Sequence, residues 1–215
     1  MKLYHGSKSG FVGPIAPTSR SSCDFGCGFY LGDSPAQPLT LVCHSRATPR
    51  FYTCSLDLDG LAAYRFDSRY EWALYIAYCR GKCEPFRGTA LYERIAHLGD
   101  GKDVLIGKIA NDRMFMVLTD FFEGSITDKA MVASLEVLNL GTQYCLKTGR
   151  ACSRVVIEDE REVSPAECRN LQVRSENQRL RAIELTQAVY RRFRRDGLFF
   201  DEFFERFADG ELPCN

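Results

Sequence analysis

Two glycine-containing segments near the start of the chain stand out as candidates for binding chemistry. The first is His5-Gly6-Ser7, and the second, residues 24–31, reads Asp-Phe-Gly-Cys-Gly-Phe-Tyr-Leu. Gly26 and Gly28 match the start of a dinucleotide-binding fingerprint, but the next glycine, Gly32, comes one place too late. The segment also leads into a strand, whereas that fingerprint closes a strand-to-helix turn. A Rossmann site is therefore excluded, and the sequence has no Walker A motif either.

Short strands are predicted to position both segments. Residues 2–5 and 29–31 read as strands, and the Gly-, Ser- and Pro-rich stretch between them reads as a loop. Ser34-Pro35 predicts the N-cap and first turn of a helix that runs to about residue 46. Further along, alternation and helical spacing predict strands at 51–58, 103–109, 143–147 and 154–158 and helices at 70–79, 113–122 and 127–138. Residues 81–102 read as irregular.

The character of the chain changes after Ser164-Pro165, where an amphipathic helical pattern runs to residue 209. Its apolar residues predict a helix face to be buried, and they are Leu180, Ile183, Leu185, Val189, Tyr190 and Phe193. We therefore expect an α+β domain over residues 1–158 and a helical C-terminal extension over 159–215. The arginines at 191, 192, 194 and 195 are typical of a solvated helix face, with binding to nucleic acid or an acidic partner as the alternative.

Composition limits the partners and the compartment. The 28 basic residues balance the 28 acidic ones, which gives no global electrostatic reason to bind nucleic acid or an anionic membrane. No apolar stretch is long enough to span a bilayer and no signal peptide is recognised, so we expect a cytoplasmic protein without a membrane partner. The ten cysteines are then expected to be free thiols or small buried hydrophobic residues. A four-thiolate zinc site from the pairs Cys23/Cys27 and Cys79/Cys83 is a weaker alternative.

Four motifs in order resemble a bacterial family of the ADP-ribosyltransferase clan, in its His-Tyr-Glu branch of diphtheria-type toxins and poly-ADP-ribose polymerases. The motifs are Tyr4-His5-Gly6-Ser7, residues 24–31, Ile106-Gly107-Lys108-Ile109-Ala110-Asn111-Asp112 and Gln143-Tyr144. The resemblance covers residues 1–158 and implies a split antiparallel β-sheet core with flanking helices. The sequence departs from the family pattern at Cys27, at Gly32-Asp33 and at Asn111.

The resemblance implies NAD as the substrate, with no metal, and gives roles to individual residues. His5 would bind the adenosine ribose, Gly6 would offer its backbone to the nicotinamide amide, and Tyr30 would stack on the nicotinamide ring. The NAD-binding set is implied to be His5, Gly6, Ser7, Arg20, Phe25, Gly26, Gly28 and Tyr30. His5 and Tyr30 also have plain structural readings, as a histidine near a strand end and as a core tyrosine.

The resemblance implies that the third catalytic position, usually glutamate, falls on Gln143, and we expect the catalytic residues to be Gln143, Tyr30, His5 and Asp112. Cleavage of the N-glycosidic bond passes through an oxocarbenium-like transition state, which an anionic side chain stabilises better than an amide does. Asp112 is the rival to Gln143 because it offers this charge, although it also reads as a helix N-cap. An ordinary strand position remains the alternative for Gln143.

Three functions follow from the resemblance. The first is mono-ADP-ribosyl transfer by an intracellular toxin or effector with a cognate inhibitor or antitoxin. The acceptor stays open between a protein, a nucleic acid and a small molecule, because acceptor choice lies in variable loops. The second is NAD glycohydrolysis with water as acceptor, and the third is an inactive module that binds NAD or ADP-ribose.

Overall fold

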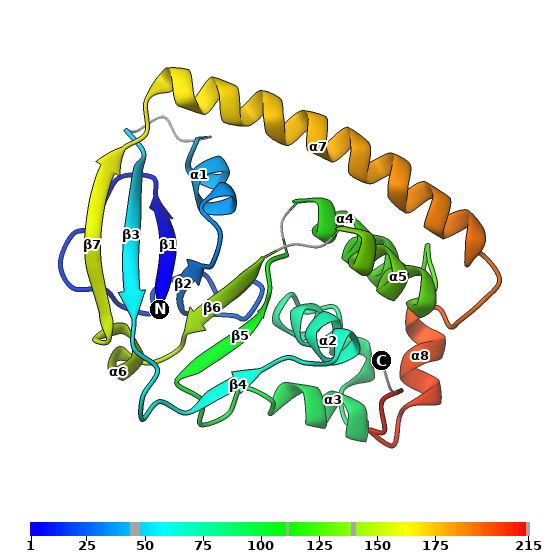
Figure 1. The fold of residues 1–215 in the computed structure, drawn as a ribbon. Helices are drawn as coiled ribbons and strands as arrows, with labels where there is room; N and C mark the ends of the chain where they lie inside the picture. Colours follow the sequence, from blue (N-terminus) through cyan, green and yellow to red (C-terminus); the bar gives the residue numbers. More distant parts are fainter. Residues whose placement is uncertain (44–47, 111, 139–140, 214–215) are drawn as a thin grey trace.

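The computed structural model describes the chain except residues 44–47, 111, 139–140 and 214–215, and for Asp112 and Arg113 it describes the backbone alone. It shows an α+β fold in which one seven-stranded sheet is covered by helices (Figure 1). The α+β class and the helical C-terminal part are as expected from the sequence. The strands are β1 (Lys2–Ser7), β2 (Phe29–Gly32), β3 (Arg50–Leu56), β4 (Ala63–Arg65), β5 (Val104–Lys108), β6 (Thr142–Leu146) and β7 (Val155–Glu162).

The helices differ from expectation mainly in the middle of the chain. They are α1 (Ala36–Val42), α2 (Arg69–Cys79), α3 (Ala90–Ala96), α4 (Asp112–Phe122), α5 (Asp128–Leu138), α6 (Gly149–Cys152), α7 (Pro165–Arg192) and α8 (Phe200–Arg206), with a 3-10 turn at Glu84–Phe86. The stretch expected to be irregular thus contains α3, which Thr89 caps by accepting from the Tyr92 N–H. At α1, Pro35 occupies the N-cap position in place of Ser34.

The sheet order is β4-β5-β6-β2-β1-β3-β7, which places the first two strands at the centre. The β4–β5 pair is parallel and the other adjacent pairs are antiparallel. One residue pair, Tyr4 with Gly32, joins β1 to β2, whereas β1 pairs with β3 along its whole length. The sheet is therefore split between its two central strands beyond Tyr4.

Apolar side chains bury both faces of the sheet. One face packs with α2, α4, α5 and α8 in a cluster that includes Phe25, Trp72 and Phe203. The other face packs Phe29, Leu31, Tyr52 and Leu146 with part of the loop that precedes β2. Because side chains alternate along a strand, Tyr30 and Phe29 point to opposite faces of β2.

The C-terminal helices belong to the main body of the protein. β7 crosses residue 158, so residues 159–162 are strand and α7 begins at Pro165, after its N-cap Ser164. Tyr190 and Phe193 pack against the core as expected, but Leu180 is 53% exposed and Leu185 51%. The fully buried residues of α7 are instead Ala182 and Thr186. Along its length α7 contacts α1, α4 and α5, as Figure 1 shows.

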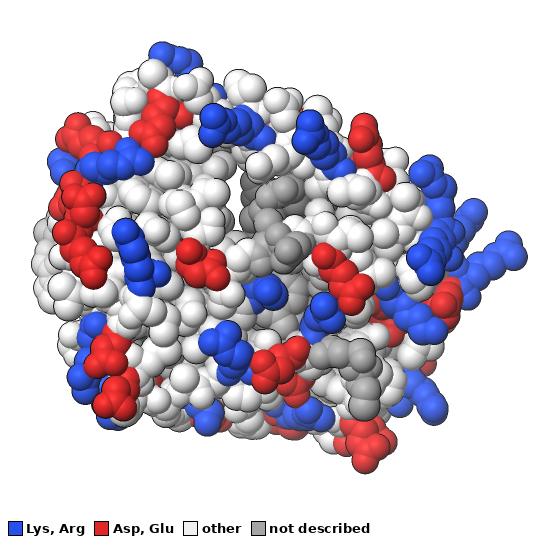
Figure 2. Space-filling view, viewed as in Figure 1, with Lys and Arg blue, Asp and Glu red and all other residues white. Residues whose placement is uncertain are grey.

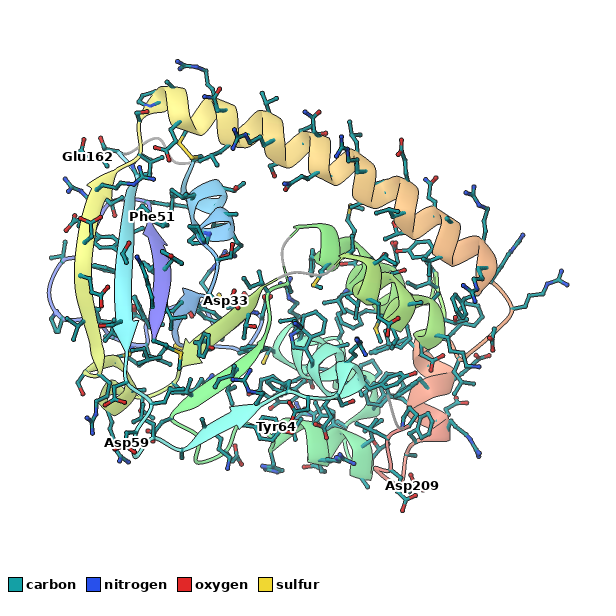
Figure 3. All side chains as sticks on the ribbon, viewed as in Figure 1. Asp33, Phe51, Asp59, Tyr64, Glu162 and Asp209 are labelled. Atoms are coloured by element: carbon teal, nitrogen blue, oxygen red, sulfur yellow. A yellow bond between two sulfur atoms is a disulfide. The ribbon has the colours of Figure 1, made fainter. Side chains whose placement is uncertain are left out.

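A disulfide joins Cys43, at the end of α1, to Cys168 in the first turn of α7. The two cysteines are 125 residues apart in sequence, and their Cα atoms lie 5.0 Å apart. Figure 3 shows this bond in yellow where α1 approaches α7. The expectation that every cysteine is free is therefore wrong for this pair, because the return of α7 across α1 brings them together.

Candidate functional site

A cleft of about 820 Å³ opens where β1 and β2 separate, bounded by α1, α4 and the loop before β2. Figure 2 shows the surface hollowed between the parts of the chain that carry α1 and α4. The cleft brings together six of the residues expected from the sequence: His5, Gly6, Arg20, Gly28, Tyr30 and Gln143. Ser7, Phe25 and Gly26 lie beside it and do not line it, and the side chain of Asp112 is outside the described part of the chain.

A single row of paired residues links the four sequence motifs. Gly107 in β5 pairs with Gln143 in β6, Gln143 pairs with Gly32 directly after the second motif, and Gly32 pairs with Tyr4 in β1. Cross-strand partners point to the same face of a sheet. The side chains of Tyr30 and Gln143 therefore face the layer that contains α1, α2 and α4. A side chain at the position of Gly6 would point to the same face.

The split between β1 and β2 leaves Gly6 without a partner in β2, although it pairs with Phe51 of β3 on its other side. If the ladder continued past Tyr4 and Gly32, Gly6 would pair with Tyr30. In the structure the Tyr30 carbonyl instead accepts a hydrogen bond from the His5 ring, with 2.7 Å between Nδ1 and the oxygen. Met1 and Leu56 exchange both of their backbone hydrogen bonds, so the alternation along the ladder turns the N–H and C=O of Gly6 away from β3 and towards this gap. They give the cleft a donor and an acceptor on the backbone.

The His5 ring is fixed in position and in tautomer. Phe29 and Phe11 stack on it with centroid distances of 4.4 and 5.2 Å. Since a carbonyl can only accept, Nδ1 carries the proton, and Nε2 of the neutral ring is left as an acceptor. Burial lowers the pKa of His5 below its usual 6.5, so this neutral form prevails at neutral pH.

Close packing explains why the glycines are present. A Cβ atom on Gly6 would lie 2.5 Å from the Pro38 carbonyl oxygen of α1, and one on Gly28 would lie 2.3 Å from the Cys145 sulfur of β6. Gly107 would meet Phe25 and Trp72 at 2.8 Å. The packing of α1 alone accounts for the glycine at position 6, whatever ligand approaches its backbone.

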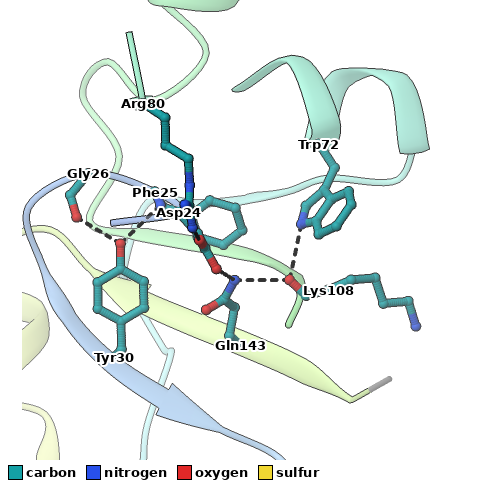
Figure 4. Close-up of polar contacts among 8 residues, drawn as sticks. All are labelled: Asp24, Phe25, Gly26, Tyr30, Trp72, Arg80, Lys108 and Gln143. Atoms are coloured by element: carbon teal, nitrogen blue, oxygen red, sulfur yellow. Dashed lines mark hydrogen bonds and ion pairs between the residues drawn. The ribbon is translucent and has the colours of Figure 1, made fainter. Parts of the chain in front are cut away.

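Tyr30 holds the turn of the second motif against the sheet. Its hydroxyl donates to the Gly26 carbonyl at 2.7 Å and accepts from the Phe25 N–H at 3.0 Å (Figure 4). Burial strongly raises the pKa of Tyr30, so the hydroxyl stays protonated. Phe25 is fully buried, and the Lys147 ammonium donates to its carbonyl at 2.7 Å. These bonds hold the turn in place directly after its first residue, Asp24.

Gln143 is buried at the end of the cleft and uses both hydrogens of its amide. Its Nε2 donates to Asp24 Oδ2 at 3.1 Å and to the Lys108 carbonyl at 3.0 Å, and Trp72 Nε1 donates to the same carbonyl (Figure 4). This arrangement fixes the direction of the amide. Its oxygen lies on the side of Tyr30, as Figure 4 shows.

Asp24 and Arg80 are functional candidates to which the sequence patterns gave no role. Arg80 Nη2 donates to Asp24 Oδ1 at 2.6 Å, and the guanidinium lies 3.9 Å from the centroid of the Phe115 ring in α4. Both charged side chains line the cleft. Asp24 was visible as the first residue of the second motif, whereas Arg80 sits at the end of α2 with no motif around it.

No metal centre is indicated in the part of the chain that the structure describes. No group of three or more His, Cys, Asp or Glu side chains there could hold a metal ion. Among the four cysteines of the zinc alternative, Cys27 is exposed whereas Cys83 is buried.

Among the described residues, no helix has the length and apolar character needed to cross a membrane.

Asp33, one of the departures from the family pattern, has a structural role. Its carboxylate accepts from the Thr142 N–H at 2.8 Å, and its own N–H donates to the Thr142 carbonyl at 2.9 Å. These bonds tie the end of β2 to the start of β6, directly beside Gln143. Asp33 therefore helps to set the register that places Gln143 in the cleft.

Comparison with known proteins adds one family. No curated protein and no solved structure matches the chain. A family model described as "Protein of unknown function (DUF3990)" matches residues 1–156, which include β1 to β6 and thus every residue that lines the cleft. The chain belongs to this DUF3990 family.

Proposed function

We propose that the chain is a mono-ADP-ribosyltransferase that cleaves NAD at the nicotinamide–ribose bond. The observation that carries this proposal is that three of the four motifs line one cleft at a split between central strands, while the motif that begins in β5 pairs directly beside Gln143. The cleft has the volume of a small-molecule site, and it combines aromatic rings with a few fixed polar groups.

The nicotinamide, a ribose and the diphosphate of NAD each have a chemically suitable partner in this cleft. The nicotinamide carboxamide needs one acceptor and one donor, which the Gly6 C=O and N–H offer at the strand split. The ring of Tyr30, held by its two hydroxyl bonds, offers a flat face to the nicotinamide ring. Nε2 of His5 accepts from a ribose hydroxyl, and the exposed guanidinium of Arg20 is suited to the diphosphate.

The reaction requires binding and electrostatic positioning, with no covalent intermediate on the protein. The N-glycosidic bond breaks and its electron pair moves to the cationic nicotinamide ring, which leaves neutral. The ribose carbon becomes an oxocarbenium-like cation, and a lone pair of the acceptor then forms the new bond. The proton that the acceptor loses passes to solvent. Rigid groups around the ribose lower the barrier because they need not reorganise during the reaction.

Nicotinamide release from NAD by the purified protein tests this proposal, and chelator is added because no metal is required. We expect release by the wild type and strong loss in Tyr30→Ala, since that variant lacks both the stacking face and the hydroxyl that holds the turn. Tyr64→Ala is the matched control, because the Tyr64 hydroxyl bonds Glu71 away from the cleft. If the wild type binds NAD without releasing nicotinamide, the chain is a binding module instead.

The acceptor and the biological role need a second measurement. Incubation of cell lysate with labelled NAD, followed by mass spectrometry, distinguishes transfer from hydrolysis to free ADP-ribose. We propose a cytoplasmic toxin or effector that a cognate inhibitor restrains, on the strength of the sequence resemblance to toxin-containing families. Arrested growth of bacterial cells on expression of the wild type, but not of Tyr30→Ala, would support this role.

A further inference from the structure

The two acceptors that contact Gln143 require an amide at this position. Asp24 Oδ2 and the Lys108 carbonyl both approach Nε2, and neither of them can donate. A glutamate here would place a carboxylate against a carboxylate and a carbonyl, which is repulsive in a buried site. Gln143 is therefore matched to Asp24, although 119 residues separate the two in sequence.

Asp24 is the acidic side chain that contacts Gln143 at this end of the cleft. Among the described residues that line the cleft, it is the single Asp or Glu. Its side chain is 14% exposed, enough to contact a bound ligand while remaining shielded from bulk water. Charges in such a partly desolvated position interact more strongly than charges in water.

Three neighbours fix the position of the Asp24 carboxylate. Arg80 binds Oδ1 and is itself held on the Phe115 ring, and the Gln143 amide binds Oδ2. The backbone of the next residue is tied to the Tyr30 hydroxyl, so the carboxylate and the aromatic ring keep a constant relation. Each carboxylate oxygen has a further lone pair after these bonds are made.

We propose that Asp24 supplies the negative charge that stabilises the oxocarbenium-like ribose, and that Gln143 and Arg80 are positioning residues for it. This inference rests on the proposed function. Because Gln143 carries no charge, the negative charge at this end of the cleft comes from the second motif. Asp24 then contacts the nicotinamide ribose on the side where the bond to nicotinamide breaks.

Four variants of the full chain test this assignment by the rate of nicotinamide release and by calorimetric NAD affinity. Asp24→Asn should lower kcat on the order of 100-fold with little change in NAD affinity, as expected for a contact that strengthens in the transition state. Gln143→Glu should also have a low kcat, because its new carboxylate faces the carboxylate of Asp24. The double variant Asp24→Asn with Gln143→Glu restores one donor and one carboxylate. Its kcat should be roughly tenfold higher than that of Asp24→Asn. Asp196→Asn is the matched control, since Asp196 pairs with Lys129 outside the cleft.

The outcomes separate this inference from the proposed function. If the wild type releases nicotinamide and Asp24→Asn matches Asp196→Asn, the role of Asp24 is overturned and the proposed function stands. If the wild type releases none, both are overturned. A purely structural role would lower thermal stability and NAD affinity together with kcat, whereas the proposed role lowers kcat alone. If Asp24→Asn fails to fold, Asp24→Glu and Asp24→Gln replace it in the test, because these two variants differ in charge but have side chains of equal length. Asp24→Glu must then release nicotinamide faster than Asp24→Gln.

Discussion

At the scale of single residues, the cleft is built from side chains whose hydrogen-bonding roles are decided by their neighbours. The His5 ring must protonate Nδ1 because its partner is a carbonyl, and the Gln143 amide must turn its nitrogen towards two acceptors. Neither role follows from residue type alone, since both side chains can donate and accept. The surrounding backbone and carboxylate groups choose between these options.

Replacing His5 should change how stability depends on pH. Because burial lowers the pKa of His5 in the folded state, the unfolded chain binds a proton first as the pH falls below about 6.5. The free energy of unfolding should therefore fall between this pH and the lower folded-state pKa. Gln at this position can still donate to the Tyr30 carbonyl but does not titrate. Between pH 7.5 and 5.5, the free energy of unfolding of His5→Gln, measured in urea, should fall by about 1 kcal/mol less than that of the wild type. Parallel losses in both proteins would contradict the assignment.

At the scale of elements, the site depends on how closely β2 approaches β6 and how closely α1 approaches β1. Gly28 lies against Cys145 and the Leu146 carbonyl, and Gly6 lies against Pro38 and Val42. The loop before β2 is closed over this contact, because Ser19 Oγ accepts from the Gly28 N–H at 3.0 Å. These contacts position the two sides of the cleft.

Gly28→Ala should disturb this contact. The new methyl group would overlap the Cys145 sulfur and touch the β6 backbone, which can yield only by moving the strand. We expect a loss of about 1–3 kcal/mol in the free energy of unfolding, together with weaker NAD binding. Gly149→Ala is the control, because a Cβ there meets no atom within 4 Å of the described residues. Equal stability of the two variants would show that β2 can adjust.

At the scale of the whole molecule, the C-terminal helices complete the core on the side of α2 and α4. Phe200, Phe203 and Phe204 of α8 are buried, and Phe203 stacks on Tyr70 of α2. α7 brings the chain to this position and is tied to α1 by the Cys43–Cys168 disulfide. Residues 165–213 contribute no lining to the cleft, yet they support the helices that form one of its walls.

Phe203→Ala should therefore destabilise the whole protein by about 3–5 kcal/mol in urea unfolding. Phe199→Ala is the matched control and should change stability little, because that ring is 38% exposed. A chain that ends at Glu162 should not fold stably, because it lacks α8 and would expose the apolar surface that α8 covers. A truncated chain that folds and binds NAD would show that residues 1–162 form an independent domain.

Local sequence patterns determined much of the sheet and the candidate site. Short apolar and β-rich runs placed β1, β2, β3, β5 and β6 to within a few residues, because a strand that is buried on both faces reads as such a run between turn residues. The order of the glycine motifs identified six of the residues that line the cleft. α3 was missed although Leu91, Tyr92 and Ile95 follow helical spacing, and β4 was missed because its three residues carry no pattern.

Tertiary structure alone decided which distant groups meet. The Asp24–Gln143 bond, the position of Arg80, the Cys43–Cys168 pair and the buried face of α7 each depend on where chain segments return after many residues. A sequence pattern reports the periodicity of one element, whereas these contacts depend on strand register, loop closure and helix docking. For that reason the sequence pointed to Gln143 as the third position, and only the fold placed a carboxylate beside it.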